Sequence, residues 1–169
     1  MTEPLDAESR LAHQPRDARP ELRLWLRLLT CTNLIEREIR RRLMDRFAIT
    51  LPRFDLLAQL DKAPDGLTLG EISRRMMVTN GNVTGLVDRI VEQGHVERRR
   101  DASDRRAQRI VMTDQGHVAF ARMAREHGQW MTELLGDLEP AEREMLMGLL
   151  GRTKASVARA LARPVEAAE

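Results

Sequence analysis

Cysteine, tyrosine and long apolar runs are scarce or absent in this chain, and these shortages exclude several classes of protein. A single cysteine, Cys31, rules out a disulfide bond within the chain. Tyrosine is absent and there are three phenylalanines and two tryptophans, whereas nine methionines suit a core of packed helices. No apolar run approaches the roughly 20 residues that span a bilayer, and the N-terminus lacks a signal-peptide pattern. We therefore expect a soluble, cytoplasmic protein.

The residue clusters typical of enzymes and metal centres are missing as well. The four histidines, His13, His95, His117 and His127, are scattered along the chain. No glycine-rich loop follows an expected strand, and no pair of carboxylates stands out from helix-surface charge. A metal site made of Cys31, His117 and His127 has no recognisable ligand spacing. We predict no catalytic residue, no metal and no cofactor.

Basic charge is concentrated in one segment. The chain has 169 residues, enough for one domain with a real core, and its net charge is only +2 although its pI is about 9.3. Between Arg98 and Arg109, however, six arginines and two aspartates give 6 − 2 = +4. A run of like charge is usually a solvated surface, so the meaning of this segment depends on its neighbours.

Residues 79–94 have the pattern of an amphipathic helix with an unusual front. Its apolar residues form one stripe at helical spacing. Thr79 is a good N-cap, since its hydroxyl can accept from a first-turn N–H, and Gly94 is a good stop. At the N-terminal end of the opposite face, which we call the front of the helix, the residues are small and uncharged. An ordinary surface helix carries Glu and Lys at such positions. Such a front suits close approach to phosphates and base edges, although a core helix with a weak N-terminus is the alternative. The stripe consists of Val83, Leu86, Val87, Ile90 and Val91, and the front of Asn80, Gly81, Asn82, Thr84 and Gly85.

The neighbours of this helix favour DNA binding. Upstream, Thr68 and Glu71 form a capping box at the start of a short helix. Downstream, residues 95–100 and 108–112 have the pattern of two strands joined by a polar turn that carries Arg105 and Arg106. Helix, turn, polar-fronted helix and basic β-hairpin make a winged helix-turn-helix, whose second helix enters the major groove. We predict a fold that is mainly α with a small β-hairpin wing.

The same residues carry a family resemblance. The run from Val78 to Arg89, followed by Asp104-Arg105-Arg106 and by Met112-Thr113, resembles the MarR family of bacterial transcription regulators, over residues 21 to 161. The resemblance implies a homodimeric repressor whose affinity for a palindromic operator is lowered by a small ligand. It also implies that Arg106 reaches a DNA groove and that Asp104 orients it. The predicted DNA-contacting residues are Thr79, Asn80, Gly81, Asn82, Thr84, Arg89, Arg105 and Arg106.

Apolar stripes at both ends of the chain predict a dimer. We expect a flexible arm over residues 1–20, a single domain over 21–162 and a tail over 163–169. Within the domain, the winged helix-turn-helix covers about 52–113, and helices cover about 21–47, 114–135 and 140–162. Because these three helices add no obvious core to the DNA-binding lobe, their stripes are best buried against a second copy. A monomer folded back on itself is the alternative.

Cys31 has two interpretations. Relatives of this fold include thiol-based peroxide sensors, but in those the reactive cysteine matches a position near Leu26 here. With Leu28, Leu29 and Leu34 nearby, Cys31 is predicted to be a small buried hydrophobe. A repressor that senses oxidants through Cys31 is the alternative within the same class of function.

The effector site is inferred from the resemblance, which places it where the DNA-binding and dimer regions join. Arginines beside apolar residues suit an anionic aromatic compound, because guanidinium binds carboxylate or phosphate bidentately. The run from Leu24 to Thr32 is similar to the subgroup that senses aromatic acids or their coenzyme A thioesters, including hydroxycinnamoyl-CoA. Alternatively, the arginines between positions 37 and 42 are an exposed face paired with Glu36 and Glu38. The predicted ligand residues are Leu28, Arg37, Arg40, Arg41, Phe54 and His127.

From a different class of function, the alternative is a protein-interaction module whose winged helix binds a protein instead of DNA. The small polar front of the helix and the paired arginines of the wing argue against it.

Overall fold

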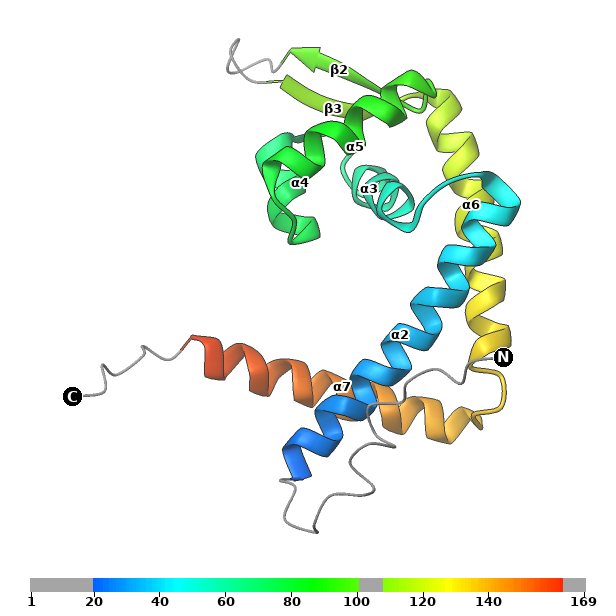
Figure 1. Ribbon diagram of the computed structural model, residues 1–169, viewed down its shortest axis with the longest axis vertical. Helices are drawn as coiled ribbons and strands as arrows, with labels where there is room; N and C mark the ends of the chain where they lie inside the picture. The colour runs from blue at the N-terminus through cyan, green and yellow to red at the C-terminus, as the bar shows by residue number, and fades with distance from the viewer. Residues whose placement is uncertain (1–19, 101–107, 163–169) are drawn as a thin grey trace, which may run out of the picture. The chain divides into compact units, whose positions relative to one another are not determined.

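Helices make up most of the chain. The computed structural model describes residues 20–100 and 108–162, with only the backbone of Asn80. Figure 1 shows the helices joined by short connections, with a small sheet at one end of the unit that holds α3 to α5. The fold is mainly α with a β-hairpin, as predicted. The helices are α2 (Pro20–Phe47), α3 (Leu51–Asp61), α4 (Leu69–Met76), α5 (Asn80–Glu92), α6 (Asp114–Leu134) and α7 (Pro140–Leu161), and the strands are β1 (Leu67–Thr68), β2 (Val96–Arg100) and β3 (Gln108–Met112).

The sheet has one strand more than predicted. Its three antiparallel strands lie in the order β1-β3-β2. In the hairpin, Val96 lies opposite Met112 and Arg100 opposite Gln108, which matches the predicted strands within one residue. Strand β1, with Leu67 opposite Ile110, was not predicted because two residues are too few for an alternating pattern. It attaches the segment before α4 to the hairpin.

Local signals account for the helix ends. The Thr68 hydroxyl accepts from the Glu71 N–H at 3.3 Å, and the Glu71 carboxylate accepts from the Thr68 N–H at 2.8 Å, so the predicted capping box is present. The chain leaves α5 through Gly94, whose φ of +73° is strained for any residue with a Cβ. The Thr113 hydroxyl accepts from the Gly116 N–H at 2.9 Å and thereby caps α6.

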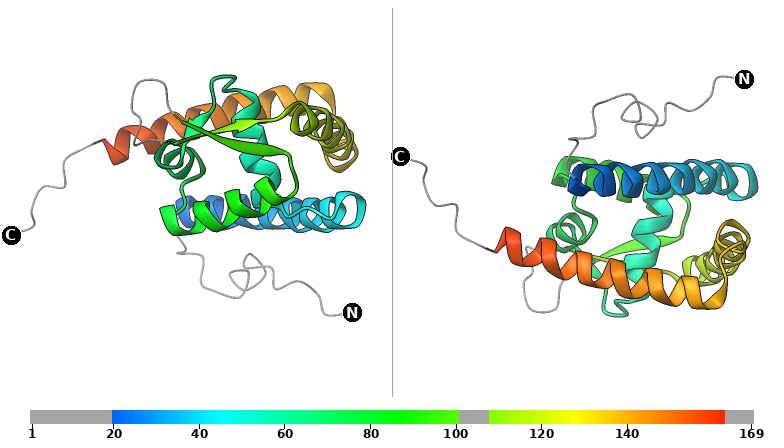
Figure 2. Two further views of the ribbon diagram at one scale, coloured as in Figure 1. Left: turned by 90° about the horizontal axis from the view of Figure 1, so that it is seen from above. Right: turned by 90° about the horizontal axis from the view of Figure 1, so that it is seen from below.

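The core lies around α3. This helix contacts α2, α4, α5 and β3, and the ribbon views show it enclosed by them (Figures 1 and 2). Because α3 is covered on several sides, it buries Phe54, Leu56, Leu57 and Leu60. Fully buried side chains from the surrounding elements complete the core, among them Leu43, Ile72, Val83, Val87, Ile90 and Ile110.

Only the second half of α2 packs into this core. Its buried residues are Ile39 and Leu43. Near its end, Arg46 pairs with Glu126 of α6 at 3.1 Å, and the Arg122 guanidinium lies 5.5 Å from the centre of the Phe47 ring. The first half has no buried residue, and Cys31 is exposed. The prediction that Cys31 is buried is therefore wrong for the single chain, because its neighbours Leu28 and Leu29 are only half-buried and Leu34 is exposed.

The chain divides into two compact units, residues 1–129 and 130–169, and the second consists of the end of α6 and of α7. Helix α7 buries none of its residues, and Met147 and Leu161 are 75% and 82% exposed. In α6, Phe120, Met123 and Trp130 are buried, whereas Leu134 is exposed. No helix within residues 20–100 and 108–162 is long and apolar enough to cross a membrane.

Candidate nucleic-acid interface

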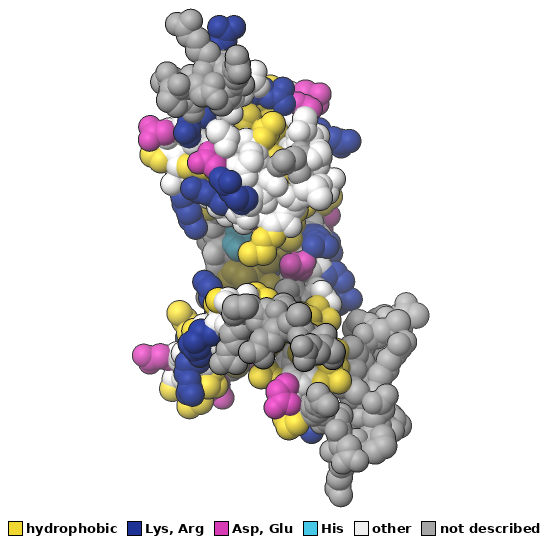
Figure 3. Space-filling view, turned by 90° about the vertical axis from the view of Figure 1, so that its left-hand side faces the viewer, with side chains coloured by type: hydrophobic (Ala, Val, Ile, Leu, Met, Phe, Trp, Pro, Cys, Tyr) yellow, Lys and Arg dark blue, Asp and Glu magenta, His cyan; other side chains and the backbone are white. Residues whose placement is uncertain are grey.

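The two faces of α5 differ as the sequence pattern predicted. Val83, Val87 and Ile90 are fully buried against the rest of the unit. On the other side, Gly81, Asn82, Thr84 and Gly85 are exposed, followed by exposed Arg89. A Cβ added at Gly81 or Gly85 would meet nothing within 4 Å, so nothing in the described chain requires glycine there. In Figure 3, basic and acidic side chains lie around an area of uncharged side chains and backbone in the upper part of the view.

The N-terminus of α5 is open. Thr79 occupies the N-cap position with an extended backbone, but its side chain makes no capping hydrogen bond, contrary to prediction. Because Thr79 is exposed, the first-turn N–H groups can be satisfied by water or by a partner. The first turn also carries no acidic residue, so its positive dipole is not neutralised. An N-terminus of this kind attracts phosphate.

A tight turn fixes α5 relative to α4. The Ser73 hydroxyl donates to the Val78 carbonyl at 2.5 Å, and the Val78 N–H donates to the Ser73 carbonyl at 3.1 Å. Between them Met77 adopts a φ of 55°, in the left-handed region. Two hydrogen bonds across five residues hold the helix-turn-helix angle rigidly, which a helix that reads base edges requires.

Ion pairs attach the hairpin to both helices. Arg98 of β2 pairs with Asp88 of α5, and Arg109 of β3 donates to the Gly66 carbonyl at 2.8 Å and lies 4.0 Å from Glu71. Hydrogen bonds from Thr68 hold the pKa of Glu71 below its usual range, with a further contribution from Arg109. The hairpin thus projects from a fixed base beside α5. The predicted wing residues Asp104, Arg105 and Arg106 lie outside the described residues.

A groove borders α5, and it was not predicted from the sequence. It has a volume of about 520 Å³ and lies between the start of α3, the exposed face of α5, and the end of α4 with the turn that follows it, where Met76 and Val78 line it. Arg53, half-buried on α3, was not predicted as a site residue, because it is distant from α5 in the sequence and lies in none of the motifs described above. We call this the Arg53 groove. Its lining includes Thr50, Pro52, Arg53, Gly81, Gly85 and Arg89.

Two of the predicted ligand residues lie together. The ring centres of Phe54 and His127 are 5.0 Å apart, and those of Phe54 and Phe120 are 5.6 Å apart. Burial lowers the pKa of His127, which favours the neutral imidazole. Leu28, also predicted, is half-buried on α2.

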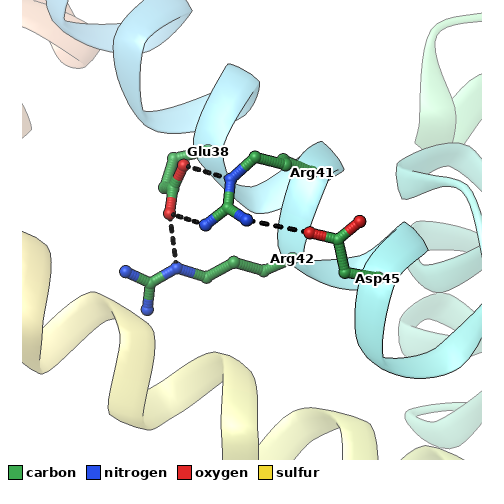
Figure 4. A network of polar contacts seen from close by, with 4 residues as sticks. All are labelled: Glu38, Arg41, Arg42 and Asp45. Carbon is green, nitrogen blue, oxygen red and sulfur yellow. Dashed lines mark hydrogen bonds and ion pairs between the residues drawn. The ribbon is translucent and has the colours of Figure 1, made fainter.

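The predicted arginines of α2 lie elsewhere, on an exposed face. Arg40 pairs with Glu36 at 2.5 Å. Arg41 bonds Glu38 at 2.7 Å and Asp45 at 2.8 Å (Figure 4). Hydrogen bonds from Arg41 and Arg42 lower the pKa of Glu38 to about 2. Arg40 and Arg41 are thus exposed and paired with carboxylates, as the alternative interpretation expects, and their contact with a ligand stays a prediction. Arg37 is exposed as well.

Comparisons with known proteins agree with this geometry. Residues 49–107 match the model of the MarR family. The chain is 31% identical over 126 residues to the transcriptional activatory protein BadR of Rhodopseudomonas palustris, covering 72% of this chain and 71% of BadR. It is 27% identical over 152 residues to the HTH-type transcriptional regulator PecS of Dickeya dadantii, covering 86% of this chain and 92% of PecS.

A solved structure extends the match to the whole fold. A MarR-family transcriptional regulator from Streptomyces coelicolor, crystallised in complex with DNA, superposes with a TM-score of 0.73 at 25% identity, over 92% of this chain and 96% of its own. These relatives are transcriptional regulators, not enzymes, and share the DNA-binding fold described above. The chain belongs to the MarR family and is a transcriptional regulator.

Proposed function

We propose that this regulator is a homodimeric repressor that binds a palindromic operator through α5 and the wing and is released by a small aromatic anion. The observation that carries the DNA contact is the exposed front of α5, where Gly81, Asn82 and Gly85 face solvent at an uncapped helix start. Glycines in a helix destabilise it relative to alanine. Their presence on an open face is explained if the helix backbone must approach another molecule closely.

The contacts divide into two kinds. The amide of Asn82 can bond a base edge in the major groove, bidentately to adenine, and Thr79, Asn80 and Thr84 lie beside it in the sequence. Arg105 and Arg106 in the wing loop suit the phosphate backbone or the neighbouring minor groove, with Asp104 orienting Arg106. The Asp88–Arg98 ion pair supports this division, because it fixes the base of the hairpin beside α5.

The proposal of a dimer rests on apolar surface at the two ends of the chain. Trp25, at the start of α2, is 56% exposed, and Leu22 and Leu24 beside it are also exposed. Helix α7 buries none of its residues and exposes a larger set of apolar side chains, among them Met145, Met147 and Leu161. Surface of this extent on a small protein marks an interaction site.

The proposed effector site is the ring cluster of Phe54, Phe120 and His127. A neutral imidazole and two phenyl rings suit an aromatic compound. Arg40 and Arg41 already bond carboxylates, so a ligand carboxylate would have to displace Glu36 or Glu38 to reach them. An aromatic acid or its CoA thioester fits this proposal, and the phosphates of CoA would oppose DNA binding by like-charge repulsion.

The test uses duplexes selected from random DNA by the full chain. Asn82→Ala should reduce discrimination between operator and random DNA by about 1–3 kcal/mol if Asn82 makes a bidentate base contact. Arg106→Ala should weaken binding to both DNAs and lower the salt slope by about 0.9 for each phosphate that the arginine neutralises. If neither variant changes binding, the α5 and wing assignment is wrong. A thermal-shift screen with aromatic acids and their CoA esters tests the ligand, because a ligand that binds the native chain raises its melting temperature. Expression from a promoter fusion distinguishes repression from the activation that the name of BadR suggests.

One observation favours a second function. The thiol of Cys31 is exposed, so oxidants can reach it. Release from DNA by peroxide that is abolished in Cys31→Ser would identify an oxidant sensor.

A further inference from the structure

We propose that the Arg53 groove seats one sugar-phosphate strand of the operator, with Arg53 of α3 as its phosphate contact. This inference rests on the proposed DNA binding by α5. It adds a third contacting element, α3, and a residue outside both the helix-turn-helix pair and the wing.

The charge of the groove is of one sign. Its lining includes Arg53 and Arg89 and no acidic residue. Within the part of the chain that the structure describes, neither guanidinium forms an ion pair, whereas Arg40 and Arg41 on α2 and Arg98 on β2 are all paired with carboxylates. Two guanidiniums in one groove without a carboxylate suit an anion, and the fork of arginine matches phosphate bidentately. The Thr50 hydroxyl, which makes no capping bond, lies on the same wall.

The floor of the groove permits close approach. Gly81 and Gly85 line it, and a Cβ at either position would project into open space. Because no side chain fills this strip, a DNA strand can lie directly against the helix backbone while Arg53 reaches it from the opposite wall. The groove shares Asn82 and Arg89 with the proposed base-reading face and is therefore continuous with it.

The helical repeat places the groove and the wing on opposite sides of the exposed face of α5. Gly81, Gly85 and Arg89 follow at intervals of four residues and form one strip along the helix, at about 100° per residue. The neighbouring strip on the other side contains Thr84 and Asp88, and Asp88 pairs with Arg98 of the hairpin. A helix in the major groove has a phosphate strand on each side. The wing thus lies with one strand, and Arg53 lies with the other.

Contacts to both strands would fix the position of α5 across the major groove. Phosphate contacts set the register and orientation of a protein on DNA, although they carry no sequence information themselves. With a phosphate contact on one side only, α5 could rotate about the wing, and Asn82 would lose its alignment with a base edge. Arg53 is therefore a positioning residue for the base contact.

The experiment compares Arg53→Ala, Asn82→Ala and Arg125→Ala in the full chain. Arg125 is an exposed arginine on α6 and is the matched control for removal of one positive charge. Fluorescence anisotropy with selected operator and random duplexes at several salt concentrations gives affinity and salt slope. Arg53→Ala should weaken binding to both duplexes and reduce the log–log slope by about 0.9 per subunit, or about 1.8 for a dimer. Arg125→Ala should change neither by a comparable amount, and thermal melting verifies that each variant is folded.

Single methylphosphonate substitutions then locate the contact. On the strand away from the wing, one neutralised phosphate should weaken binding of the parent chain but produce no further weakening in Arg53→Ala. If Arg53→Ala leaves the DNA affinity and the salt slope unchanged while Asn82→Ala weakens operator binding, the inference is overturned and the proposed function stays intact. If both variants bind as the parent does, the proposed function fails as well. If Arg53→Ala keeps DNA binding but abolishes stabilisation by benzoate, the groove is a small-anion site and the inference is overturned.

Discussion

Replacing Gly85 by alanine should stabilise the fold and weaken operator binding, two effects of opposite sign from one methyl group. Gly85 lies inside α5, and a Cβ there would meet nothing within 4 Å. Alanine in a helix interior is favoured over glycine by about 0.5–1 kcal/mol, largely because it restricts the unfolded chain. For a protein of this size, about 2–4 °C of melting temperature accompanies each kcal/mol, so we expect a rise of about 1–4 °C.

The same methyl group would narrow the space between α5 and DNA. If the helix backbone approaches DNA along the strip of Gly81, Gly85 and Arg89, the methyl holds it off and weakens its base contacts. One base contact is worth about 1–3 kcal/mol, so operator affinity should fall by a factor of about 5 to 160. Thermal melting and anisotropy on one preparation measure both effects.

Gly128→Ala is the matched control for this prediction. Gly128 is also exposed inside a helix, α6, with open space where its Cβ would be, but it lies away from α5 in the sequence. It should raise the melting temperature similarly and leave DNA binding unchanged. A Gly85→Ala chain that is more stable and binds the operator as tightly as the parent would show that this strip does not touch DNA.

Three further changes probe other parts of the molecule. Burial lowers the pKa of His127, so the unfolded chain binds its proton at a higher pH than the native chain, and stability is lost as the pH falls below about 6.5. His127→Phe should reduce this loss of stability in denaturant titrations between pH 7.5 and 5.5. The same pH dependence in the variant and the parent would contradict this prediction. Glu71→Ala removes half of the capping box and should lower the free energy of unfolding, measured by urea titration, by about 0.3–1.5 kcal/mol. Cys31→Ser should change neither the melting temperature nor the DNA affinity, because the side chain is exposed.

Features set by neighbouring residues could be predicted from the sequence. The capping box at Thr68 and Glu71, the stop at Gly94 and the strands of the hairpin each depend on residues close in the chain, and all are present. The exposed front of α5 was predicted for the same reason, since helical spacing separates it from the apolar stripe. Family resemblance then gave this local pattern a function.

Features that depend on tertiary packing could not be predicted in this way. Cys31 has apolar neighbours in sequence, but the half of α2 that carries it has no buried residue. The Arg53 groove forms only when the start of α3 is placed beside α5, which are separated by β1 and α4 in the chain. The Thr79 hydroxyl is at the N-cap position as predicted, yet position alone does not ensure that the hydrogen bond forms.

Helix α7 exposes large apolar side chains that the single chain does not bury. Burying a leucine or methionine side chain contributes about 1.5–3 kcal/mol, so the seven large ones exposed on α7 represent a free energy comparable to the stability of a whole domain. A chain that left this surface in water would associate through it. Closed association of identical chains requires a face that is complementary to itself, and a helix with apolar residues along most of its length can provide one. We therefore expect α7 to be buried by a second copy, which would also set the spacing between two α5 helices and hence between operator half-sites. Those side chains are Met145, Leu146, Met147, Leu149, Leu150, Val157 and Leu161.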